Sequence, residues 1–175
     1  APPTHPRNPG GARHGTRSGA GQPPADTPRA AKPSPRPGIA AIIGGRVIGG
    51  GWAARFLLNG WDVRISDPSP SIREQIEAIL ANARASLPAL CDVPMPPEGK
   101  LSFAESLEAA VAGADWIQES VPERLDLKHA VIDEIQAHAR TDAIVGSSTS
   151  GYKPSELRAN SRVPEQVIVA HPFNP

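Results

Sequence analysis

The residue best suited to proton transfer is His171, which directly follows the apolar run at residues 167–170. An imidazole titrates near neutral pH, so at the end of a strand it could act as a general acid or base. The alternative is a buried neutral histidine that only completes the strand.

A second candidate site is the glycine-rich hexapeptide GGRVIG at residues 44–49. Turns that bind the pyrophosphate of a dinucleotide follow the pattern G-x-G-x-x-G between a strand and a helix. The first and third glycines are present, whereas Arg46 occupies the middle position. A loop that only packs the helix against the strand would look similar. As a cofactor site, the turn would provide Gly44, Gly45, Val47, Ile48 and Gly49.

Asp67 lies 23 residues after Gly44, at the end of the next predicted strand. There a carboxylate can accept both ribose hydroxyls of adenosine and would repel a 2′-phosphate. We therefore expect NAD rather than NADP as the cofactor. The alternative is a turn residue, because Asp suits the position before Pro68.

Arg46 is the main departure from the pattern, because the middle glycine lets the backbone approach the pyrophosphate. Backbone strain or displacement costing about 1–3 kcal/mol would lower NAD affinity roughly 10- to 100-fold. A guanidinium that swings outward could instead pair with the phosphates.

The elements that would position these residues alternate between strands and helices. Apolar or alternating runs predict strands at residues 39–43, 61–67, 101–103, 115–119, 143–146 and 167–170. Helices are expected at residues 47–59, at 71–87, after residue 120 and near Pro154, with Ser-x-x-Glu capping boxes at Ser71, Ser102 and Ser120. This alternation predicts an α/β fold with a doubly wound, mostly parallel sheet, the Rossmann-like architecture that binds nucleotides at the carboxyl ends of its strands.

Composition divides the 175 residues into two segments. Residues 1–37 hold ten prolines, five glycines, six Arg or Lys and one acid, without Val, Ile, Leu, Phe, Trp or Tyr, so we expect a disordered tail. Residues 38–175 hold 12 basic and 17 acidic residues, a net charge of −5, which disfavours nucleic acid as a partner. We expect them to form one nucleotide-binding domain.

The lone Cys91 excludes an intrachain disulfide. No apolar run is long enough to cross a bilayer, so we expect a cytoplasmic protein without a membrane partner. His129 and His138 lack the carboxylate or cysteine spacing of a metal site, and no metal is expected.

Four strings carry a family resemblance: GWAARFLLNGWDV, ADWIQESVPERLDLK, GSSTSGYKPSEL and VAHPFNP. In order and spacing they resemble the N-terminal domain of the 3-hydroxyacyl-CoA dehydrogenase superfamily across residues 39–175. Within it they are most similar to the branch that oxidises L-carnitine, followed by the L-gulonate dehydrogenase and lambda-crystallin branch. The resemblance implies NAD-dependent oxidation of the 3-hydroxyl of a small hydroxy acid, foremost L-carnitine to 3-dehydrocarnitine.

Position by position, the resemblance implies that His171 is the catalytic base and that Ser150 contacts substrate and nicotinamide. The Ser150 hydroxyl could donate to the reacting oxygen as it becomes a carbonyl, or it could only satisfy the backbone of its own turn. Glu123, Lys128 and Asn174 are implied to contact NAD. Alternatively, Glu123 completes the capping box of Ser120, Lys128 is a snorkelling side chain, and Asn174 forms an Asn-Pro turn.

The family also has a glutamate downstream that orients the histidine, and an all-helical domain that closes the substrate site and forms a homodimer. Neither occurs within these 175 residues, so we expect the chain alone to be inactive and to dimerise only with that domain.

Two other functions stay open. One is a 3-hydroxyacyl-CoA dehydrogenase, although the family's CoA-contacting serine and lysine have no obvious counterparts and this region offers Arg73 and Arg84 instead. The other is a non-catalytic remnant in which Arg46 impairs NAD binding.

Overall fold

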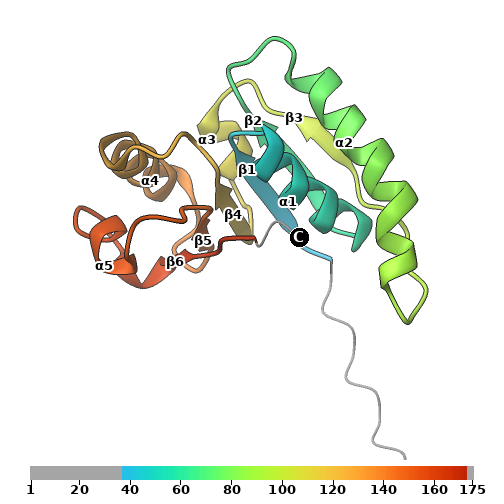
Figure 1. Cartoon of the computed structure of the whole chain (residues 1–175). Coiled ribbons are helices and arrows are strands. Elements are labelled where there is room, and N and C mark those ends of the chain that lie inside the picture. Colours follow the sequence, from blue (N-terminus) through green and yellow to red (C-terminus); the bar gives the residue numbers. More distant parts are fainter. Residues whose placement is uncertain (1–36, 173–175) are drawn as a thin grey trace, which may run out of the picture. The chain divides into compact units, whose positions relative to one another are not determined.

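The computed structural model describes residues 37–172, whose strands form a six-stranded sheet (Figure 1). The strands are β1 (Ile39–Ile43), β2 (Asp62–Ser66), β3 (Leu101–Phe103), β4 (Trp116–Glu119), β5 (Ile144–Ser147) and β6 (Val167–Val169). Their order is β3-β2-β1-β4-β5-β6, and every neighbouring pair is parallel. The strand order reverses between β1 and β4, which is where doubly wound sheets bind ligands. The predicted fold class is confirmed.

Helices cover both faces of this sheet (Figure 1). They are α1 (Val47–Leu58), α2 (Ile72–Ser86), α3 (Leu107–Val111), α4 (Leu125–His138) and α5 (Pro154–Leu157), with 3-10 turns η1 (Leu87–Leu90) and η2 (Pro164–Gln166). Successive side chains of a strand point to opposite faces. Accordingly, Ala40 and Ile42 of β1 pack with α1 and α2, whereas Ala41 and Ile43 pack with α3 and α4.

The predicted capping boxes are wrong: one serine makes another local bond, and the other two do not stand at the start of a helix. Ser71 does precede α2, but its hydroxyl accepts from Gln75 Nε2 at 2.7 Å and caps no backbone N–H. Ser102 lies inside β3, and the N-cap of α3 is Ser106. Ser120 lies too early, since α4 starts only at Leu125.

The predicted tail at residues 1–37 lies outside the described residues except for its last position. None of the helices in residues 37–172 has the length and apolar character needed to cross a membrane.

Candidate functional site

The candidate residues follow the carboxyl ends of five parallel strands. Gly44 comes after β1, Asp67 after β2, Glu123 after β4, Ser150 after β5 and His171 after β6. Because parallel strands end at the same edge of a sheet, the topology gathers these residues along one edge.

Two glycines let the turn between β1 and α1 fold tightly. Gly44 has a φ of +89°, which favours glycine, and a Cβ there would lie 2.7 Å from the carbonyl oxygen of Ser120. A Cβ on Gly49 would lie 1.8 Å from the carbonyl oxygen of Gly44. The first turn of α1 therefore starts directly against the end of β1, as a pyrophosphate site requires.

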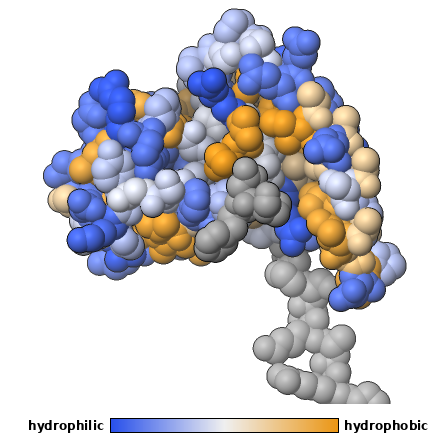
Figure 2. Space-filling model, in the orientation of Figure 1, coloured by the Kyte–Doolittle hydropathy of each residue, from blue (hydrophilic) through white to orange (hydrophobic). Residues whose placement is uncertain are grey.

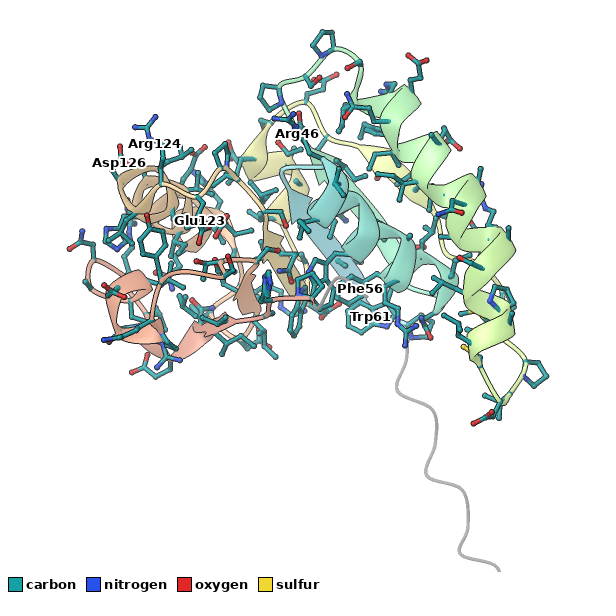
Figure 3. All side chains as sticks on the ribbon, in the orientation of Figure 1. Arg46, Phe56, Trp61, Glu123, Arg124 and Asp126 are labelled. Carbon is teal, nitrogen blue, oxygen red and sulfur yellow. The ribbon has the colours of Figure 1, made fainter. Side chains whose placement is uncertain are left out.

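Arg46 fits this turn without backbone strain. It is the N-cap of α1, with a φ of −65° and a ψ of −162°, which is extended backbone open to any residue. Its side chain is exposed at the N-terminal end of α1 (Figure 3). The backbone strain considered for Arg46 is therefore absent. Its side chain could still displace the pyrophosphate or pair with it.

Asp67 joins the second strand to the glycine turn. Its Oδ2 accepts from the backbone N–H of Gly45 at 2.8 Å, and its Oδ1 accepts from that of Ser69 at 2.8 Å. Each oxygen has a further lone pair, so the carboxylate can still accept ribose hydroxyls. The turn role and the ribose role are therefore compatible.

A cavity of about 670 Å³ opens beside this carboxylate, a size typical of small-molecule sites. Asp67 and Arg46 line it from one side, and Ser120 and Val121 line it from the β4 side. Nearby, Val47 and Ile48 expose 77% and 36% of their surface, and the space-filling view shows hydrophobic side chains over this end of α1 (Figure 2). The cavity and the turn together fit an adenine dinucleotide.

Lys128 is buried, with 1% of its side chain exposed. Its Nζ donates to the two carboxylate oxygens of Glu119 at 2.9 and 3.1 Å and to the carbonyl oxygen of Val121 at 3.4 Å, and it forms an ion pair with Glu123 Oε2 at 3.2 Å. The snorkelling interpretation is wrong, because all three N–H groups of the ammonium have acceptors within the protein. Any contact with NAD would have to share these bonds.

Glu119 is a residue that sequence reasoning missed. It is fully buried at the end of β4, where it also accepts from the N–H of Val121 at 2.8 Å and from the hydroxyl of Ser147. A carboxylate at the end of a predicted buried strand, with a lysine on the apolar face of the next helix, was the available signal.

Glu123 holds the loop that carries Ser150 (Figure 3). Its Oε1 accepts from the Thr149 hydroxyl and from the N–H groups of Ser150 and Gly151 at 3.2 and 3.1 Å. Desolvation raises the pKa of this carboxyl, but the hydrogen bonds from Thr149, Gly151 and Lys128 outweigh it and hold the pKa below its ordinary value.

Ser150 and His171 lie beyond neighbouring strands, since Ser147 of β5 pairs with Val169 of β6. Both side chains are exposed, and His171 Nδ1 lies 3.1 Å from the carbonyl oxygen of Ser148. Asn174 lies outside the described residues. Within residues 37–172, no group of three His, Cys, Asp or Glu side chains could hold a metal.

Comparisons with known proteins agree with this geometry. The family described as "3-hydroxyacyl-CoA dehydrogenase, NAD binding domain" matches residues 39–175. An L-carnitine dehydrogenase/betainyl-CoA thioesterase of Ruegeria pomeroyi is 65% identical over 136 residues, 78% of this chain and 28% of that protein. An L-carnitine dehydrogenase of Mesorhizobium japonicum is 55% identical over 137 residues, 78% of this chain and 38% of that protein. This chain thus spans well under half the length of these relatives.

A solved structure shows the same fold. The NAD⁺-dependent 5-formyl-3-hydroxy-2-methylpyridine 4-carboxylic acid 5-dehydrogenase superposes with a TM-score of 0.71 at 34% identity, covering 79% of this chain and 45% of that one. The chain therefore belongs to the 3-hydroxyacyl-CoA dehydrogenase family, as its NAD-binding domain.

Proposed function

We propose that this domain, residues 38–175, serves an NAD-dependent dehydrogenase that oxidises the 3-hydroxyl of L-carnitine. The bond from the Gly45 N–H to the Asp67 carboxylate carries the proposal, because it fixes an adenosine-binding carboxylate against the glycine turn. The names of the relatives that are 55–65% identical supply the substrate. A homodimer, a helical partner domain and a cytoplasmic location belong to the same proposal.

The chain would hold NAD by its adenosine half at the β1 and β2 ends. Asp67 would accept the ribose hydroxyls, and the backbone of Gly45, Val47 and Ile48 would face the pyrophosphate. The unstrained, exposed Arg46 would pair with a phosphate oxygen. Bound NAD supplies a hydride acceptor.

The reacting end would lie at the ends of β5 and β6. We assign proton acceptance from the 3-hydroxyl to His171 Nε2 and hydrogen-bond donation to the same oxygen to Ser150 Oγ. Glu123 would contact the cofactor while holding the Ser150 loop, and Asn174 would lie on the nicotinamide side. Lys128 would act chiefly by keeping Glu123 in place.

The two arginines that could bind CoA give little support to the alternative that the substrate is a CoA thioester. Arg84 binds Glu98 through two hydrogen bonds of 3.1 and 2.7 Å, and the Arg73 guanidinium lies 4.4 Å from the centre of the Phe103 ring. Both cations are already engaged within the domain.

Calorimetric titration of NADH into the chain and its Arg46→Gly variant tests the cofactor part. With no strain to relieve and an exposed phosphate contact to lose, we expect Arg46→Gly to bind NADH more weakly than the wild type by up to about three-fold, or roughly 0.6 kcal/mol. If only Arg46→Gly bound NADH tightly, the result would instead favour the interpretation of the chain as a non-catalytic remnant.

A chimera tests the substrate part. Residues 38–175 would replace the matching region of the Ruegeria pomeroyi relative, and NADH formation would be followed with L-carnitine and with 3-hydroxybutyryl-CoA. We expect turnover of L-carnitine only, abolished by His171→Gln, and no turnover by the 175-residue chain alone. Turnover of the CoA thioester in preference to L-carnitine would reject the proposed substrate.

A further inference from the structure

Gln118 is a buried polar residue that the proposed chemistry does not yet use. It lies in β4 with none of its surface exposed, where an amide is costly unless its hydrogen bonds are made. Its Oε1 accepts from Trp116 Nε1 at 3.0 Å. Because an indole N–H only donates, this bond fixes which way the amide points.

The NH₂ group of Gln118 consequently points away from Trp116, toward the ends of β5 and β6. It donates to the hydroxyl of Ser148 at 2.8 Å and to the carbonyl oxygen of Ala170 at 3.2 Å. Ala170 immediately precedes His171, and Ser148 provides the carbonyl oxygen that lies 3.1 Å from His171 Nδ1. One amide therefore holds both the residue that precedes His171 and the residue whose carbonyl oxygen lies beside its ring.

The Ser148 carbonyl also favours one tautomer of His171. A carbonyl oxygen only accepts, so in this bond Nδ1 carries the proton and the lone pair of the neutral ring is on Nε2. Two further contacts hold Ser148, because its hydroxyl lies 2.7 Å from that of Ser120 and its N–H donates to the Glu119 carbonyl oxygen at 2.8 Å.

We propose that Gln118 is a positioning residue for His171: by holding Ser148 and Ala170 together, it keeps the imidazole in the Nδ1–H tautomer. The inference rests on the proposed role of His171 as proton acceptor. It explains why the buried strand β4 carries a glutamine that is hydrogen-bonded to the residues following β5 and β6.

The test is the tautomer of His171 in the 175-residue chain, read from its imidazole ¹⁵N chemical shifts at alkaline pH without cofactor. His171→Gln assigns the signals. We expect the Nδ1–H form to predominate in the wild type. In Gln118→Met, which keeps the length but removes the amide, we expect the ratio of tautomers to move about five-fold toward Nε2–H, the loss of one ordinary hydrogen bond.

Gln166→Met is the matched control. Gln166 is also buried and donates to two carbonyl oxygens, of Arg140 at 2.9 Å and Ala143 at 3.1 Å, yet it contacts neither Ser148 nor Ala170. Its variant should leave the His171 tautomer unchanged. Circular dichroism checks that each variant is folded.

If Gln118→Met does not fold, Ser148→Ala decides, because it removes the Gln118 bond and the Ser120 contact of the Ser148 hydroxyl but keeps the carbonyl. Ser120→Ala, which removes only the Ser120 contact, is its control. A smaller shift in the same direction supports the proposal. An unchanged tautomer in the folded variant, or a wild type that is mainly Nε2–H, overturns it. NADH titration of the same samples tests the cofactor part of the proposed function separately, because NADH binding does not depend on the His171 tautomer. Normal NADH binding with an unchanged tautomer would overturn the role of Gln118 alone.

Discussion

At the scale of single residues, Asp67 combines a structural bond with a proposed contact to the cofactor. Its Oδ2 holds the Gly45 N–H, so replacement by alanine would disturb the glycine turn as well as the ribose site. Asp67→Asn is the sharper change, because the amide oxygen can keep the Gly45 bond, while the negative charge and the second bond, from the Ser69 N–H, are lost.

We predict that Asp67→Asn weakens NADH binding about ten-fold and narrows the preference over NADPH, because the charge no longer repels a 2′-phosphate. Calorimetric titrations with both cofactors measure this. Asp62→Asn is the control, since Asp62 is exposed at the opposite end of β2. An unchanged NADH to NADPH preference in Asp67→Asn would remove Asp67 from the ribose site.

The lowered pKa of Glu123 predicts that the free energy of unfolding depends on pH. Its pKa lies below the ordinary value of 4.5 in the folded state, so its contribution is complete above pH 4.5 and is lost as pH falls through the folded value. Because 43% of the side chain is exposed, we expect this contribution to be at most about 1 kcal/mol.

Urea unfolding at several pH values should show a shallower acid-dependent loss of stability in Glu123→Gln than in the wild type. Glu134→Gln, an exposed position of α4, should behave as the wild type does. Identical acid profiles for the wild type and Glu123→Gln would mean that the bonds to Thr149 and Gly151 do not distinguish the carboxylate from a neutral group.

At the scale of elements, a buried ion pair joins β4 to α4. Lys128 and Glu119 are both essentially inaccessible to solvent, and their bonds of 2.9 and 3.1 Å are bidentate at the carboxylate. Burying two charges costs desolvation, so removing one partner should be worse than removing both.

We predict that Lys128→Met lowers the free energy of unfolding by about 3–5 kcal/mol, because Glu119 is left buried without its counter-ion. The double variant with Glu119→Gln should regain more than half of that loss. Urea denaturation of the two single variants and the double variant measures the coupling. Additive losses would show that the two residues contribute independently.

Element positions could be predicted from periodicity more reliably than element ends. The apolar runs fixed β1 and β3 at the predicted residues, and Gly60, with a φ of +84°, ends α1 close to where it was expected. The Ser120 capping box failed because Ser120 binds Ser148 and Glu123 binds Thr149. A local pattern cannot show that a residue 26 or 28 positions away will form a hydrogen bond with the side chain expected to cap the helix.

Candidate site residues could likewise be predicted where a side chain suited to binding or proton transfer directly follows a predicted strand. Asp67 and His171 were found because each follows a strand whose pattern is clear. Glu119 and Gln118 were missed because a strand pattern alone indicates only that they are buried. Their hydrogen-bond partners come from β5, β6 and α4, and only the assembled sheet brings those elements together.

At the scale of the whole domain, β1 connects two cores on opposite faces of one sheet. One core holds Ala40 and Ile42, and the other holds Ala41 and Ile43. Since β1 lies between β2 and β4 in the sheet, neither core can be lost without exposing the strand that the other also needs. We therefore expect the described domain to unfold as one cooperative unit.

Tryptophan fluorescence and far-ultraviolet circular dichroism should give coincident urea transitions, although Trp52, Trp61 and Trp116 all pack against the first core. NADH at about 100 times its dissociation constant should raise the free energy of unfolding by about 2.7 kcal/mol in both signals. Because the adenosine half of the site is proposed to lie at β1 and β2, an equal shift means that binding there stabilises the β4 to β6 half through the shared strand. A fluorescence transition that NADH shifts while the dichroism transition stays in place would show that the two halves unfold separately, and that the ligand acts on one of them.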